Sequence, residues 1–179
     1  MNLEKAKELK QTCWNKLLEI NSNTEIKSCP NCKSSNIKKM IEDYNYANYL
    51  SAVILMENGW KVKPNPSVKE IDLLGEDPVG NKVAVEIKTE FYPSDNFFME
   101  FADKGKPKDY WVKALWEKEE GVYYGAICGK TKTLHLYDLI KFRETNTLNA
   151  VVSKYNTTGY LLNRNEPYEF KVGVFELGV

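Results

Sequence analysis

Two acids and a lysine lie on neighbouring apolar segments of the chain, at a spacing suited to metal binding. Asp72 belongs to the segment at residues 69–75, and Glu86 and Lys88 lie two residues apart in the segment at residues 81–91. Strand side chains alternate between faces, so Glu86 and Lys88 point the same way. Neighbouring strands joined by a short turn usually pair, which would bring all three side chains together. Such a group can bind a hard divalent cation and an activated water.

This pattern resembles the PD-(D/E)XK nuclease superfamily, which has the restriction-endonuclease-like fold. That motif is an Asp at a strand end, a hairpin-like connection, and then Asp or Glu, any residue and Lys. Here Asp72 is followed, after thirteen residues, by Glu86-Ile87-Lys88. The resemblance is to small phage-type or restriction-type members; it is close over residues 41–90 and continues weakly to residue 111. It departs at residues 69–71, where some members have a Pro before the Asp.

The resemblance implies a metal-dependent DNA endonuclease that hydrolyses phosphodiester bonds. Asp72, Glu86 and the backbone carbonyl of Ile87 would hold Mg²⁺ or Mn²⁺. Lys88 would orient or deprotonate the attacking water and offset charge on the phosphate. Glu42, on the preceding helix, would support the metal site; the alternative is that it only favours the positive start of that helix.

Other interpretations of the same residues stay open. A Glu and a Lys two residues apart also fit a solvated pair on the polar face of an antiparallel sheet. With the fold retained, the chain could be a catalytically inactive nucleic-acid-binding or assembly module, or a member that acts on RNA. The DNA structure recognised is open, and a homodimer is common where two strands must be cut.

The cysteines suggest a second, structural metal. Cys29-Pro30-Asn31-Cys32 has the spacing of one zinc knuckle, but a closed zinc site needs four ligands and no second pair follows. Cys13, Cys128, His135 or a second subunit could complete it; the alternative is reduced thiols without metal. We expect His135, flanked by leucines, to lie on the polar face of a strand. Four cysteines without a leader segment indicate a reducing compartment, the cytoplasm, or the host cytoplasm if the protein is phage-encoded.

A basic segment with aromatic residues is the candidate nucleic-acid interface. Phosphate neutralisation and base stacking both use such residues, although a solvated loop is the alternative. Its lysines are Lys104, Lys106, Lys108 and Lys113, with Tyr110 and Trp111 among them. Glu100 would extend the acidic site if its strand borders the catalytic pair. The formal net charge of zero does not argue against nucleic acid.

Hydrophobic periodicity predicts where the elements lie. The predicted helices are residues 3–20, 40–58 and 138–145, and the predicted strands are 60–62, 69–75, 81–91, 97–101, 122–128, 133–136, 158–163 and 168–177, the last two paired with each other.

These elements predict an α/β fold with a mixed central β-sheet of about five strands, flanked by helices on both faces in the restriction-endonuclease-like arrangement. At 179 residues the length fits one domain with a small appendage. We therefore expect a Cys-containing N-terminal extension, residues 1–39, before a nuclease-like domain at residues 40–179. No apolar run is long enough to span a membrane.

Overall fold

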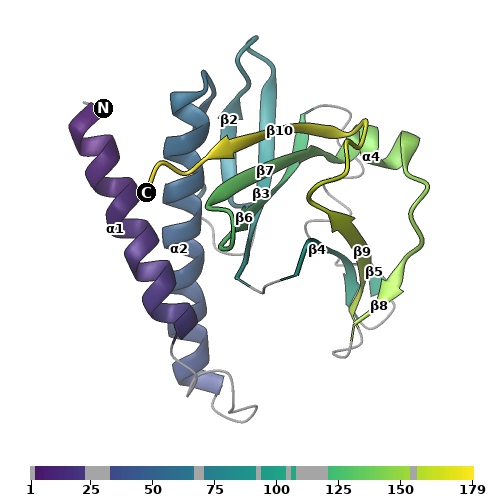
Figure 1. Cartoon of the computed structure of the whole chain (residues 1–179), viewed down its shortest axis with the longest axis horizontal. Helices are drawn as coiled ribbons and strands as arrows, with labels where there is room; N and C mark the ends of the chain where they lie inside the picture. The colour runs from purple at the N-terminus through teal and green to yellow at the C-terminus, as the bar shows by residue number, and fades with distance from the viewer. Residues whose placement is uncertain are drawn as a thin grey trace.

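A mixed six-stranded sheet lies at the centre of the protein (Figure 1). The computed structural model describes residues 3–22, 33–66, 71–91, 94–103, 106–107, 121–153 and 157–179. In spatial order the strands are β1 (Lys61–Pro64), β2 (Leu73–Glu76), β3 (Lys82–Glu90), β6 (Val122–Cys128), β7 (Thr133–Asp138) and β10 (Lys171–Glu176). Neighbours are antiparallel except β3 and β6, which are parallel. The predicted α/β class is confirmed, with six strands in this sheet where about five were expected.

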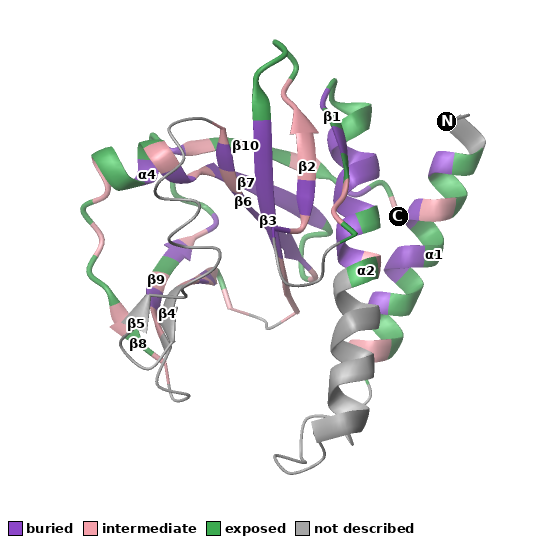
Figure 2. Cartoon of the chain, turned by 180° about the vertical axis from the view of Figure 1, so that it is seen from behind, coloured by how far each residue is buried: buried purple, intermediate pink, exposed green. Residues whose placement is uncertain are grey.

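Two helices cover one face of this sheet, as both views show (Figures 1 and 2). They are α1 (Leu3–Ser22) and α2 (Lys33–Glu57). Trp14 and Leu17 of α1 are buried in the same cluster as Ile54 of α2 and Val85 and Ile87 of β3. The first helix therefore packs as part of the domain core.

Helix α2 begins earlier than predicted. It starts at Lys33, whereas the sequence pattern placed its start at Met40, so it crosses the predicted boundary between residues 39 and 40. Ser34, Ser35 and Asn36 have intermediate helix propensity and Lys33 is a good helix former, so the sequence permits this earlier start.

The opposite face is covered mainly by a smaller sheet, so the expectation of helices on both faces holds only in part. Its strands, in spatial order, are β5 (Lys106–Pro107), β4 (Asn96–Asp103), β9 (Thr157–Asn163) and β8 (Val151–Val152). Helix α4 (Leu139–Thr145) packs beside it, capped by Asp138, whose carboxylate accepts from Lys141 N. Phe97, Leu162 and Phe142 are buried there against Tyr124 and Tyr137 of the main sheet.

The predicted pairing of the last two strands is wrong. Strand β9 pairs with β4 and β8 in the smaller sheet, whereas β10 pairs with β7 at the edge of the main sheet. Alternation of apolar residues indicates a strand but does not identify its partner.

Within the described residues, no helix is long and apolar enough to cross a bilayer.

Shortening Leu17 tests whether α1 belongs to the core. Leu17 is fully buried and its neighbour Leu18 is 43% exposed. We expect Leu17→Ala to lower the free energy of unfolding by about 2–5 kcal/mol, because it leaves a cavity in the core. Leu18→Ala should cost less than about 1 kcal/mol in the same denaturant titration. Equal effects of the two substitutions would show that α1 does not contribute to the core.

Candidate metal centre

Asp72 lies immediately before β2, where its side chain takes over a position in the sheet's hydrogen-bond ladder. The last register pair between β2 and β3 is Leu73 with Val85. Beyond it, the backbone N–H of Ile87 donates to Asp72 Oδ2 at 2.7 Å. The strand was predicted to start at residue 69; it starts at Leu73, and residues 67–70 lie outside the described part. This side-chain contact explains the later start.

The second oxygen of Asp72 is held by the helix layer. Asn48 of α2 donates from Nδ2 to Asp72 Oδ1 at 3.0 Å. Each carboxylate oxygen therefore accepts a hydrogen bond from a different element, one from β3 and one from α2. The sequence alone does not predict this contact, because the position of Asn48 on the helix does not reveal its partner.

Glu86 and Lys88 lie on the face of β3 that points away from the helices. The alternate residues Val85 and Ile87 are buried in the helix-side cluster. Lys88 Nζ lies 2.8 Å from Glu86 Oε1, and Glu86 is opposite Tyr124 of β6 in the parallel register. The predicted pairing of the two motif strands is thus confirmed, and it brings the predicted residues into one site.

The environment of Glu86 opposes its negative charge. Only 6% of the residue is exposed. Burial is the main reason that the pKa of Glu86 is raised to about 7; the charge and hydrogen bond of Lys88 lower it, and the smaller effects of Asp72 raise it. Near neutral pH, Glu86 can therefore lose its proton when a cation binds beside it.

The oxygen atoms at this site fit a hard divalent cation. In a strand, the N–H and C=O of one residue point to the same edge, so the Ile87 carbonyl points toward the side where its N–H meets Asp72. Asn48 Oδ1 is buried and has no hydrogen-bond partner among the described residues. Among the described side chains, no cluster of three or more His, Cys, Asp and Glu could hold a metal. Two carboxylates, a carbonyl and retained waters suit Mg²⁺.

Tyr124 forms part of the wall of the site on β6. Its hydroxyl donates to the carbonyl of Phe98 on β4 at 3.4 Å, which links the two sheets. Burial raises its pKa above the usual range, so it stays a neutral donor. Glu100 lies on β4, which pairs with β5 and β9 and not with β3. Its charge, like that of Glu86, raises the pKa of Tyr124, so its role in the acidic site stays a prediction.

Several predicted residues lie outside the described part of the structure. Glu42 belongs to α2, but its side chain is not described, and the same holds for Lys106 on β5. The others are Cys29, Cys32, Lys104, Lys108 and Lys113. Their proposed roles in metal and nucleic-acid binding stay predictions.

The extra zinc ligands suggested by the sequence do not come together. Cys13 and Cys128 are both buried free thiols, but Cys13 packs in the helix-side cluster and Cys128 in the cluster on the other face. They cannot both ligate one ion through the intervening sheet. His135 was expected on a polar surface and is instead buried, edge-to-face against Phe97, because both faces of β7 are covered.

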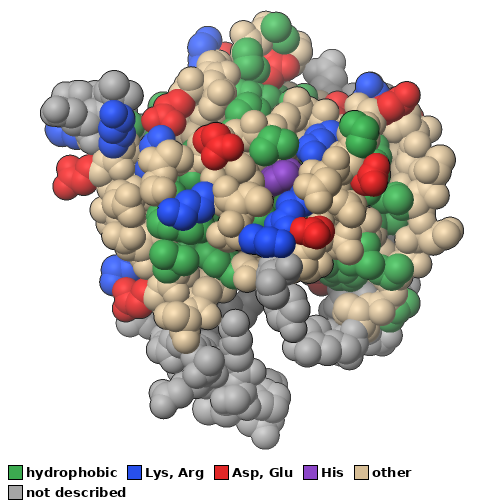
Figure 3. Space-filling model, viewed as in Figure 1, with side chains coloured by type: hydrophobic (Ala, Val, Ile, Leu, Met, Phe, Trp, Pro, Cys, Tyr) green, Lys and Arg blue, Asp and Glu red, His purple; other side chains and the backbone are tan. Residues whose placement is uncertain are grey.

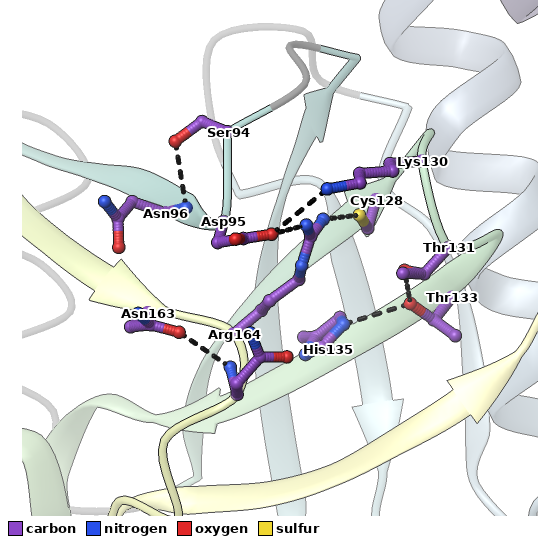
Figure 4. Close-up of polar contacts among 11 residues, drawn as sticks. Ser94, Asp95, Asn96, Cys128, Lys130, Thr131, Thr133, His135, Asn163 and Arg164 are labelled. Carbon is purple, nitrogen blue, oxygen red and sulfur yellow. Dashed lines mark hydrogen bonds and ion pairs between the residues drawn. The ribbon is translucent and has the colours of Figure 1, made fainter.

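A second polar cluster, which the sequence did not indicate, joins the two sheets (Figure 4). The buried Arg164, just after β9, donates to Asp95, which precedes β4, and to Cys128 Sγ at the end of β6. Asp95 also binds Lys130 at 3.3 Å. The acids and bases of this cluster satisfy one another, so it fastens the smaller sheet to the larger one.

The face drawn in Figure 3 does not resemble a nucleic-acid surface. Lysines, arginines and acids are interspersed there among apolar side chains. A phosphate backbone would favour a surface on which positive charge dominates. Among the described side chains, this face therefore offers no evident DNA interface.

Comparisons of the chain with protein-family models, curated proteins and solved structures found no match. The functional argument therefore depends on the geometry of the site.

Replacing Glu86 tests the electrostatic description. The raised pKa means that unfolded chains lose this proton first, so the wild type should lose stability as pH rises from about 4.5 to about 7. In chelator, Glu86→Gln should match the wild type at pH 4 and melt at a higher temperature at pH 8.

Glu76, whose side chain is about half exposed in an ion pair with Lys61, provides the matched control for this experiment. Glu76→Gln should show no such pH-dependent gain. A Glu86→Gln protein that is less stable than the wild type at pH 8 would contradict the assignment.

Proposed function

We propose that this protein is a metal-dependent DNA endonuclease of the PD-(D/E)XK type, hydrolysing phosphodiester bonds. One observation carries the proposal: the carboxylate of Asp72, bonded to Ile87 N, lies beside a buried Glu86 that is paired with Lys88. If Glu86 and Lys88 were only a solvated ion pair on a polar sheet face, Glu86 would not need to be buried or to have a raised pKa. Such perturbed groups are typical of functional sites.

The three side chains would divide the work of hydrolysis. Asp72 and Glu86, with the Ile87 carbonyl, would hold Mg²⁺ or Mn²⁺. When bound, the cation lowers the pKa of a water and polarises the scissile phosphate. Lys88 has about a quarter of its side chain exposed, so its ammonium lies near the solvent side of the site. It would orient the attacking water or deprotonate it, and its charge would offset that on the phosphate.

The topology of the sheet is consistent with this proposal. The motif strands β2 and β3 are adjacent and antiparallel, and the Asp lies at a strand end, as the superfamily motif requires. A reducing cytoplasmic setting is part of the proposal and fits the two buried free thiols, Cys13 and Cys128.

The alternative, an inactive binding or assembly module, has less support. Burying Glu86 beside Asp72 costs stability above neutral pH. In a module that only binds other molecules, this loss of stability would serve no function. An RNA substrate would use the same chemistry, so the assay must include it.

A cleavage assay with linear, supercoiled, single-stranded and branched DNA, and with RNA, tests the proposal. We expect the wild type to cut DNA with Mg²⁺ or Mn²⁺ and not with EDTA. Lys88→Ala should reduce the single-turnover rate at least about 100-fold while leaving the fold intact, because it removes the group that handles the water. Asp72→Ala should lose cleavage and metal binding together.

Lys141→Ala, on the exposed side of α4, is the matched control and should cleave like the wild type. Equal rates for wild type and Lys88→Ala would contradict the catalytic role of Lys88. Cleavage of RNA alone would transfer the proposal to that substrate.

A further inference from the structure

We infer that Asn48 is the positioning residue of this metal centre: its amide N–H orients Asp72, and its amide oxygen accepts a hydrogen bond from a water on the bound cation. This inference rests on the proposed function. It assigns to α2 a neutral amide in contact with the site, independently of whether Glu42 also takes part.

The position of Asn48 makes its contact with Asp72 well defined. Asn48 is 7% exposed on a helix packed against β1 and β3. Its Nδ2 lies 3.0 Å from Asp72 Oδ1, while Ile87 N lies 2.7 Å from Asp72 Oδ2. Two donors from separate, rigid elements fix the plane of the carboxylate. Partners of this kind orient the ligands of protein metal sites.

The orientation of the Asn48 amide follows from charge. If the amide were reversed, its oxygen would face the carboxylate of Asp72, and two acceptors would repel each other. The nitrogen therefore faces Asp72, and Oδ1 is left buried without a partner among the described residues. An unmade hydrogen bond at a buried polar atom costs about 1–3 kcal/mol.

A water on the cation would supply the missing donor. The amide oxygen belongs to the same small group as the nitrogen that contacts Asp72, so it lies close to the carboxylate that would hold the cation. Waters on a divalent cation are polarised and donate strongly. The unpartnered oxygen is thus explained by what the site would bind.

A neutral residue suits this position better than a third acid. Burial already opposes the charge of Glu86, and Asp72 lies next to it; Lys88 counters the charge of Asp72 but not the cost of burial. Another carboxylate against Asp72 would add more negative charge, whereas an amide donates to Asp72 without adding charge.

Calorimetric titration of Mn²⁺ at pH 8 tests the inference without relying on catalysis. Asn48→Ala and Asn48→Leu should each weaken Mn²⁺ binding by about 10- to 100-fold, the usual effect of removing such a partner. Leu has the branching of Asn without its polar atoms, so it preserves packing if the Ala variant folds poorly.

Asn58→Ala is the matched control, since Asn58 directly follows the same helix and its side-chain amide donates to the carbonyl of Ile54. It should bind Mn²⁺ like the wild type. If the Asn48 variants lower the melting temperature in chelator but keep the wild-type Mn²⁺ affinity, Asn48 is only structural and the inference is overturned.

The same proteins in the DNA cleavage assay separate this inference from the proposed function. If the Asn48 variants bind Mn²⁺ more weakly but the wild type cuts no DNA, Asn48 is a positioning residue and the proposed nuclease function is wrong. If the wild type cuts DNA but the variants keep the wild-type Mn²⁺ affinity, the nuclease function stands and the role of Asn48 is wrong. A wild type that binds no Mn²⁺ would overturn both.

Discussion

Placing Glu86 beside Asp72 inside the protein is the constraint on which the site depends. Glu86 loses hydration there and lies next to the charge of Asp72, so it keeps its proton until the pH is near neutral. Lys88 counters the charge of Asp72 but not the cost of burial, which a proton or a cation can relieve. A site with this property is unstable when empty and gains free energy by binding a divalent ion.

The surrounding layers maintain that strained arrangement. The helices bury the apolar side of β3, and α2 holds Asp72 through Asn48. On the other face, the smaller sheet packs against Tyr124, the neighbour of Glu86 on β6. The Arg164 cluster fastens that sheet in place at the end of β6. Residues outside the motif therefore hold together the layers around β3 and β6, where the motif residues meet.

Local sequence patterns predicted the elements around the motif and the faces of their side chains, but not the contacts between elements that are distant in the sequence. The two-residue period around Glu86 and Lys88 fixed their common face, and the short turn before β3 fixed the partner strand. The partner of β9, the burial of His135 and the contact between Asn48 and Asp72 depend on how distant elements dock. A single sequence records such docking only weakly, because an apolar strand looks the same in either sheet.

The most direct measurement is the proton balance of Mn²⁺ binding, obtained by calorimetry in buffers of different ionisation enthalpy. The account predicts one Mn²⁺ per chain, with close to one proton released at pH 6 and far less at pH 8, because Glu86 must lose its proton to act as a ligand. Glu86→Gln should abolish the proton release and weaken binding. Absence of Mn²⁺ binding, or the same affinity and proton release in Glu86→Gln, would contradict the account.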